Sequence, residues 1–64
     1  MTNKKLEKAI LRLVKNEPES LPRIIFRLRV EYPSVPIKAA TQTIWRLVDR
    51  GVLALSPDRK IIEA

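Results

Sequence analysis

The sequence contains neither cysteine nor histidine, and it has a single glycine and one each of Trp, Tyr and Phe. Without cysteine the chain cannot form disulfides, use a thiol nucleophile or bind a metal through thiolates, and without histidine it lacks the commonest general base. The 7 acidic residues are scattered without forming a pair suited to acid–base catalysis, and a lone glycine cannot make a glycine-rich phosphate loop. We therefore expect a protein that is not an enzyme, that has no metal or cofactor and that takes no small-molecule ligand.

Long hydrophobic segments are also missing. No apolar run approaches the roughly 20 residues of a membrane-spanning helix, and the N-terminus lacks the apolar segment of a signal peptide. A soluble, cytoplasmic protein without membrane contact is expected, with residues 1–64 forming one domain around one small core that self-association would support. The net charge of +6 favours a polyanionic partner, a property that nucleic acids share with anionic membrane surfaces.

Residues 36–50 are predicted to form an amphipathic helix that ends at Gly51. Pro36 fits the first turn because it has no N–H to lose there, and Gly51 can adopt the left-handed conformation that ends many helices. The apolar stripe recurs at three- and four-residue spacing and comprises Ile37, Ala40, Ile44, Leu47 and Val48. The opposite face carries Lys38, Gln42, Arg46 and Asp49, with Thr41 and Trp45 on its flank. This mostly basic face is either a solvated surface or one that lies in a nucleic-acid groove.

Residues 3–16 are predicted to form an earlier helix, capped by Thr2 or Asn3 and ended by the Glu17-Pro18 pair. Its apolar stripe comprises Leu6, Ala9, Ile10, Leu13 and Val14. Most of the surplus positive charge of the chain lies on this helix. We favour a solvated face over direct phosphate contact, because nothing in the sequence indicates that these cations point toward a common ligand. Leu11 lies off the stripe and is either a lone exposed leucine or part of a subunit contact.

Residues 21–31 are predicted to form a further helix, with Ser20 as its N-cap and Pro22 in its first turn. Its core stripe comprises Leu21, Ile24, Ile25 and Leu28. Phe26 and Val30 form an apolar pair on nearly the opposite side, which favours additional core, with a dimer seam as the alternative. The prolines of residues 32–36 then force the chain to change direction before the helix at 36–50.

After Gly51 the pattern changes to two short runs rich in branched aliphatic residues, and residues 52–63 are predicted to form a β-hairpin. Residues 56–59, Ser-Pro-Asp-Arg, have the composition of a type I turn. With the first and last turn residues facing each other, the predicted pairs are Leu53 with Ile62 and Ala54 with Ile61, and Arg59 and Lys60 lie near the tip.

This order of three helices, glycine and hairpin resembles a winged helix-turn-helix domain. The run VPIKAATQTIWRLVDRGVLALSPDRKIIE is similar to the recognition helix and wing of MarR-like and related winged-helix transcription regulators, most clearly from Leu47 through Gly51 to Leu53. The sequence departs from that pattern at Thr43, where the family usually has an apolar residue, at Val35-Pro36, which replaces a polar cap, and in its short wing.

The resemblance implies a mostly α (α+β) fold, a three-helix winged helix-turn-helix with a C-terminal β-hairpin wing. It also implies a sequence-specific, nucleoid-associated transcription regulator that binds double-stranded DNA. The residues at positions that reach base edges in the family are Lys38, Ala39, Thr41 and Gln42, and those in the wing are Arg59 and Lys60. Of these, Gln42 could pair with adenine and Lys38 could address guanine.

The roles of the remaining candidates are less specific. Thr41, Trp45 and Arg46 would contact phosphate or sugar, although Trp45 could instead cover the core with its indole N–H in water. A homodimer would use Leu11, Phe26 and Val30. Two other functions stay open, a winged-helix adaptor that binds proteins within a larger complex and, with less support from so few aromatic residues, an RNA-binding protein.

Overall fold

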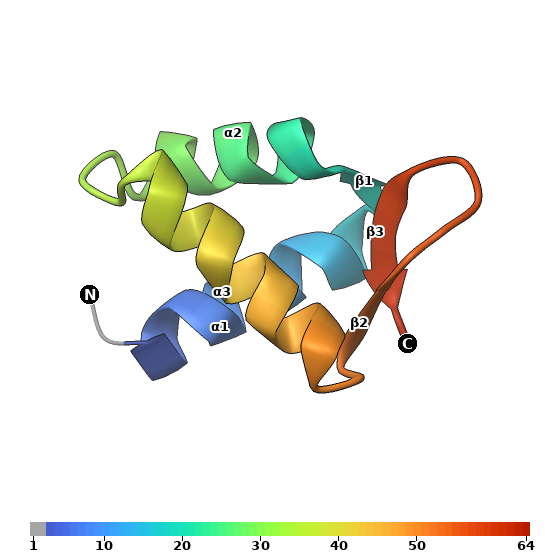
Figure 1. Cartoon of the computed structure of the whole chain (residues 1–64). Helices are drawn as coiled ribbons and strands as arrows, with labels where there is room; N and C mark the ends of the chain where they lie inside the picture. Colours follow the sequence, from blue (N-terminus) through green and yellow to red (C-terminus); the bar gives the residue numbers. More distant parts are fainter. Residues whose placement is uncertain (1–2) are drawn as a thin grey trace.

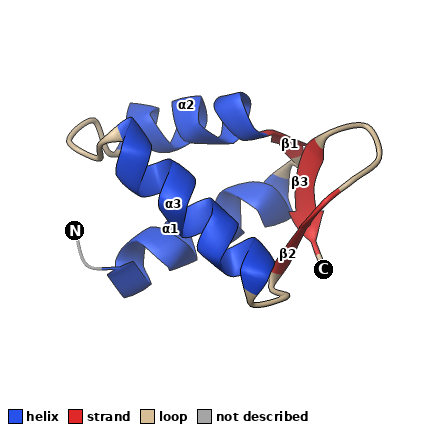
Figure 2. Ribbon diagram, viewed as in Figure 1, coloured by secondary structure: helices blue, strands red, loops and turns tan. Residues whose placement is uncertain are grey.

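The computed structural model describes residues 3–64, which form three helices and a small three-stranded antiparallel sheet (Figures 1 and 2). In chain order the elements are α1 (Asn3–Asn16), β1 (Glu19–Ser20), α2 (Leu21–Glu31), α3 (Ile37–Asp49), β2 (Leu53–Leu55) and β3 (Lys60–Glu63). The three predicted helices are therefore confirmed to within one residue at each end, and the predicted hairpin is formed by β2 and β3. The architecture is α+β.

The three helices surround a core that the sheet closes at one end. In Figure 1, α3 runs diagonally between α1 and α2, and the hairpin lies at the end of the molecule opposite the α2–α3 turn. The buried apolar residues are Leu6, Ala9, Ile10, Leu13, Val14, Ile24, Ile25, Leu28, Val35, Ala40, Ile44, Leu47, Leu53 and Ile61. They include the whole predicted stripe of α1 and most of the stripe of α2. Burying each larger aliphatic side chain contributes about 1.5 to 3 kcal/mol, so this set supplies the main driving force for folding.

The buried face of α3 is rotated relative to the predicted stripe. Ile37 was predicted to be buried but is 56% exposed, whereas Thr43 is buried. The helix turns by about 100° per residue, so a stripe centred on Ala40, Thr43 and Leu47 moves Ile37 to its edge. Burial of Thr43 is tolerated because its hydroxyl donates a 2.8 Å hydrogen bond to the carbonyl oxygen of Ala39.

The predicted glycine stop of α3 is confirmed. Gly51 has φ of +78°, its N–H donates to the carbonyl of Val48 at 3.0 Å, and the N–H of Val52 donates to the carbonyl of Leu47 at 2.9 Å. These two bonds form a Schellman motif, which satisfies carbonyl groups that the helix end leaves without an internal partner. The motif turns the chain directly from α3 into β2.

The starts of α2 and α3 differ in detail from the predictions. Pro22 lies in the first turn of α2 as predicted, but Ser20 makes no side-chain capping bond, and its backbone pairs with Lys60 instead. Pro36 precedes α3 with an extended backbone rather than lying in its first turn. At α1, Asn3 is the first residue of the helix, and Thr2, the other predicted cap, lies outside the described residues.

The hairpin register is shifted by one residue from the prediction. The observed pairs are Leu53 with Glu63, Ala54 with Ile62 and Leu55 with Ile61. The loop has three residues rather than two, because the N–H of Arg59 closes the type I turn on the carbonyl of Ser56 at 2.9 Å while Arg59 itself takes φ of +64°. A type I turn alone would splay the strands, and a following left-handed residue restores their twist.

A third strand was not predicted from the sequence. β1 pairs antiparallel with β3, Glu19 opposite Ile61 and Ser20 opposite Lys60, so β3 is the central strand in the order β1-β3-β2. Two residues are too few to show a strand period in the sequence. This pairing fixes the hairpin against the start of α2.

Two apolar side chains on α2 do not reach the core. Phe26 is 60% and Val30 is 65% exposed, so the prediction that they extend the core is wrong. The reason is that α1 and α3 both pack on the other side of α2, where Ile24 and Leu28 lie. Leu11 on α1 is half-buried and packs against the core, so it is not a lone exposed leucine.

Candidate nucleic-acid interface

The outward face of α3 lies opposite its buried stripe. Lys38, Gln42, Trp45 and Asp49 are all exposed and recur at a spacing of three or four residues, which places them in one row along the helix. The side chains of Lys38 and Gln42 make no hydrogen bond or ion pair within residues 3–64. This row therefore presents a cation, an amide, an indole and a carboxylate to solvent. The ammonium of Lys38 and the amide of Gln42 are groups that pair with base edges in a groove.

Thr41 and Ala39, two of the three other candidates on α3, lie on opposite flanks of this row. The hydroxyl of Thr41 donates a 2.9 Å hydrogen bond to the carbonyl oxygen of Ile37, which leaves the oxygen available to accept a bond. Ala39 is half-buried and lines a small pocket with Leu6 and Val35, facing α1. Of the residues predicted to reach base edges, Lys38 and Gln42 therefore face outward together, whereas Ala39 faces away from them.

Arg46 lies on the flank of α3 that faces α1, where Glu7 draws it inward. Its Nη1 atom is 3.9 Å from Oε2 of Glu7, and Nη1 of Arg50 is 3.4 Å from Oε1 of the same carboxylate. Glu7 is the one acid within residues 1–16, and sequence analysis did not assign it a role. Its contacts with Arg46 and Arg50 depend on how α1 packs against α3, which the sequence does not reveal.

The hairpin loop carries the other predicted cations. Arg59 is exposed, and its side chain has no hydrogen bond or ion pair among the described residues. Lys60 lies 3.8 Å from the carboxylate of Asp58, between Nζ and Oδ2. The loop therefore presents two cations and one carboxylate, a smaller positive charge than its two basic residues alone suggest.

Asp58 is held in its charged form by its neighbours. The hydroxyl of Ser56 donates a hydrogen bond to the Asp58 carboxylate, and this bond is the main reason that the pKa of Asp58 is lowered, with a smaller contribution from the charge of Lys60. The same Ser56 oxygen accepts a 2.9 Å hydrogen bond from the N–H of Lys60. Asp58 thus belongs to the internal bonding of the turn.

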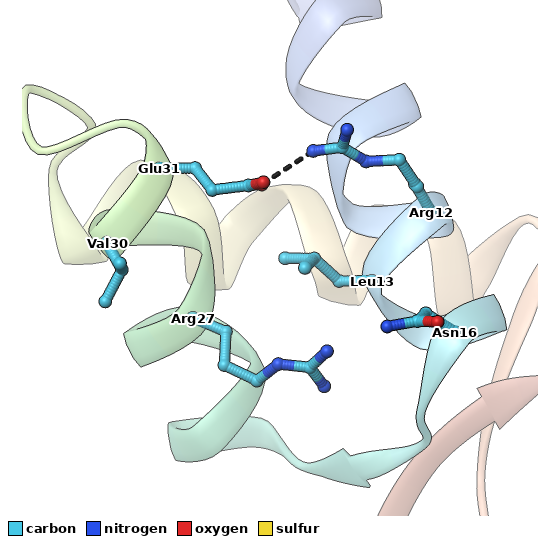
Figure 3. A pocket seen from close by; sticks show the side chains of 6 residues that line it. All are labelled: Arg12, Leu13, Asn16, Arg27, Val30 and Glu31. Carbon is cyan, nitrogen blue, oxygen red and sulfur yellow. Dashed lines mark hydrogen bonds and ion pairs between the residues drawn. The ribbon is translucent and has the colours of Figure 1, made fainter.

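A cleft of about 490 Å³ between α1 and α2 also contains arginine side chains (Figure 3). Arg12 bridges the cleft to Glu31 at 2.6 Å, and Arg27 lies 3.7 Å from Glu19 and donates to the carbonyl of Glu17 at 3.1 Å. Both guanidinium groups already have acceptor oxygens within the chain, and Glu31 adds negative charge to the cleft, so the cleft attracts an external anion less than its two arginines alone would.

The candidates are distributed along the length of the molecule. The start of α3 and the hairpin loop lie at opposite ends (Figure 1), and the longest extent of the Cα atoms is 31 Å. At 3.4 Å per step this length corresponds to roughly 9 base pairs, close to one turn of B-form DNA. The structure therefore brings Lys38, Gln42 and Trp45 together on one face of α3, places Ala39, Thr41 and Arg46 on its flanks, and keeps the hairpin cations apart from Lys38.

Three further observations concern other classes of site. None of the helices within residues 3–64 has the length and apolar character that crossing a membrane requires. Over the same residues, no group of three or more acidic side chains comes together that could hold a metal ion. No known protein family, curated protein or solved structure matches the chain.

Proposed function

We propose that the chain is a sequence-specific double-stranded DNA-binding protein, a small transcription regulator of the winged-helix type. The observation that carries the proposal is the outward row of α3, in which Lys38, Gln42 and Trp45 are exposed on a helix whose opposite side anchors it in the core. Because the opposite side of α3 is packed in the core, the exposed side can enter the major groove without any loss of core contacts.

Each exposed group has a chemical role in this proposal. The amide of Gln42 pairs bidentately with adenine, and the ammonium of Lys38 addresses the acceptor atoms of guanine. The hydroxyl of Thr41, the indole N–H of Trp45 and the guanidinium of Arg46 contact phosphate or sugar and set the orientation of the helix. The loop cations Arg59 and Lys60 reach the flanking backbone about one turn away.

The carboxylate of Asp49 limits how α3 can lie. It is exposed on the outward row, three residues after Arg46 and close to the C-terminal end of the helix. A carboxylate and the negative end of a helix dipole both repel phosphate. We therefore expect the first half of α3 to lie deepest in the groove. This agrees with the proposal that Lys38 and Gln42 contact bases.

An adaptor function is the alternative, and one observation favours it. Apolar side chains on α2 and at the start of α3 are exposed although the chain is small, which is typical of a surface that contacts another protein. DNA binding and protein binding are compatible, because Phe26, Val30 and Ile37 are not part of the outward row of α3.

An NMR titration of the ¹⁵N-labelled protein with duplex DNA tests the proposal. We expect chemical-shift changes at Lys38, Gln42 and Trp45 that weaken as salt is added, with a smaller response to single strands of the same sequence. Tighter binding to single-stranded RNA would favour the RNA-binding alternative. A lack of change with any duplex at low salt would contradict the proposal.

A further inference from the structure

An apolar groove lies between α2 and the start of α3. It has a volume of about 350 Å³ and is lined by Leu21, Pro22, Ile25, Phe26, Arg29 and Ile37. Of the five large apolar side chains that residues 3–64 expose, Phe26 and Ile37 line this groove, whereas Val30, one turn further along α2, lines the cleft between α1 and α2. A chain of 64 residues gains little by leaving such side chains in water, so the patch indicates a surface that a partner covers.

The rim of the groove is positively charged. The Nε atom of Arg29, which lines the groove, donates a 3.0 Å hydrogen bond to the carbonyl of Val35, and this bond holds its guanidinium at the edge. Arg23 lies beside the groove: its Cζ atom is 5.7 Å from the ring centroid of Phe26, its Nε atom is 3.7 Å from Oε2 of Glu19, and its side chain is 63% exposed. No acidic residue lines the groove, so its apolar lining is combined with one arginine at its edge, Arg29, and a second arginine, Arg23, beside Phe26.

We propose that this groove docks an acidic amphipathic helix of another protein, with its apolar side chains on Phe26 and Ile37 and its carboxylates facing Arg23 and Arg29. A concave apolar surface between two helices is the usual receptor for one face of a third helix, and arginine pairs with carboxylate through charge-assisted hydrogen bonds. This interaction goes beyond DNA binding and uses none of the candidate DNA contacts.

Charge favours such a partner over a second copy of the chain. In a two-fold contact at Phe26, an axis across α2 makes the two helices antiparallel and brings Arg23 of one copy to Arg29 of the other, whereas an axis along α2 brings each arginine to the same arginine of the other copy. Like charges placed together at an interface oppose association. An acidic helix instead brings the opposite charge to both arginines.

The test uses a synthetic helical peptide of about 16 residues, long enough to hold helical structure. It carries leucines on one face and glutamates on both sides of that face. Two control peptides replace the glutamates by lysines or disperse the same leucines around the helix. We expect the acidic amphipathic peptide alone to cause saturable ¹⁵N chemical-shift changes at Leu21, Phe26 and Ile37.

Matched variants locate the binding. Phe26→Ser and Ile37→Ser are expected to weaken binding of the acidic peptide by about fivefold or more, since exposed anchors at the centre of an interface carry most of its energy. Leu55→Ser is the control, because Leu55 is 50% exposed but lies on β2 outside the groove. Thermal unfolding of the three variants checks that each remains folded.

Several results would overturn the proposal. They are no response to the acidic peptide, an equal response to the lysine peptide, or an equal loss for Leu55→Ser. Sedimentation that shows a dimer dissolved by Phe26→Ser would assign the groove to a second copy. Binding that depends on Phe26 to phosphatidylcholine vesicles containing phosphatidylglycerol, without binding of the peptide, would assign it to a lipid surface. None of these results bears on whether α3 binds DNA.

Discussion

The carboxylate of Glu7 on α1 lies 3.4 Å from the guanidinium of Arg50 just after α3, although the two residues are 43 positions apart in the sequence. The same carboxylate lies 3.9 Å from Arg46, and the Glu7 side chain is only 19% exposed. One carboxylate therefore draws two cations toward α1 and away from the outward row of α3. The arginine side chains are 44% and 57% exposed, and ion pairs with such exposed partners contribute little to stability, so the main consequence concerns what these arginines can bind.

Glu7→Gln is expected to raise the affinity for any DNA duplex by about two- to fivefold, because Arg46 and Arg50 no longer share an internal carboxylate. The slope of log affinity against log salt should steepen by up to about one unit. Fluorescence anisotropy at several salt concentrations measures both quantities. Glu63→Gln is the control, since it removes the same charge from an exposed position with no ion pair among the described residues. Equal effects of the two variants would show that net charge alone is responsible.

Gln42→Ala is expected to leave the fold and non-specific binding intact while costing about 1 to 3 kcal/mol of discrimination at one base position. The side chain is exposed and has no partner within residues 3–64, so its loss leaves no unsatisfied group. Competition among duplexes with single base changes measures the effect, and Lys15→Ala on α1 serves as the control. A variant with an unchanged sequence preference would show that α3 is not the reading helix.

Arg59→Gly combined with Lys60→Ala is expected to weaken binding to all duplexes about equally. The wild-type slope of log affinity against log salt should be about −4 to −5, and the variant should flatten it by about one to two units. Glycine suits the φ of +64° at position 59, so the double variant removes charge without straining the turn. A change in sequence preference would instead mean that the hairpin loop contacts bases.

Gly51→Ala is expected to destabilise the protein by about 1 to 2 kcal/mol, because a left-handed conformation is unfavourable for residues that carry a Cβ atom. At Gly51 an added Cβ would meet no atom within 4 Å, so the cost arises from the φ of +78° and not from a clash. Thermal unfolding followed by circular dichroism should show a lower Tm, and Gly51→Asn should lose less because asparagine tolerates this conformation better. Equal losses for the two variants would contradict this explanation.

Asp58 is expected to titrate below its usual pKa of 3.8, because the hydroxyl of Ser56 donates to the carboxylate. A lowered pKa means that the carboxylate contributes stability above pH 3.8 and that this contribution is lost as the pH falls through the lowered value. A ¹³C NMR titration of the Asp58 carboxyl group measures the midpoint, which should rise toward the usual value in Ser56→Ala. A midpoint that Ser56→Ala does not change would exclude the hydroxyl as the cause.

Patterns that depend on near neighbours in the chain were readable from the sequence. The stripe of α1 from Leu6 to Val14 recurs at helical spacing, and all five of its predicted residues are buried. Pro22 and Gly51 mark a helix start and a helix end through their own backbone preferences. In each case the information lies within a few residues, so local chemistry is sufficient to predict the element.

Features that depend on contacts between distant segments were decided only by the tertiary structure. The orientation of α3 about its axis buries Thr43 and exposes Ile37. This orientation is set by the packing of the whole helix against α1 and α2, which contributes more free energy than burial of one additional isoleucine would. The hairpin register follows from the left-handed Arg59, a conformation that composition does not reveal for a residue other than glycine. The approach of Glu7 to Arg50 and the groove beneath Phe26 likewise exist only once the helices pack, because their members come from different elements whose relative positions are set by the whole core.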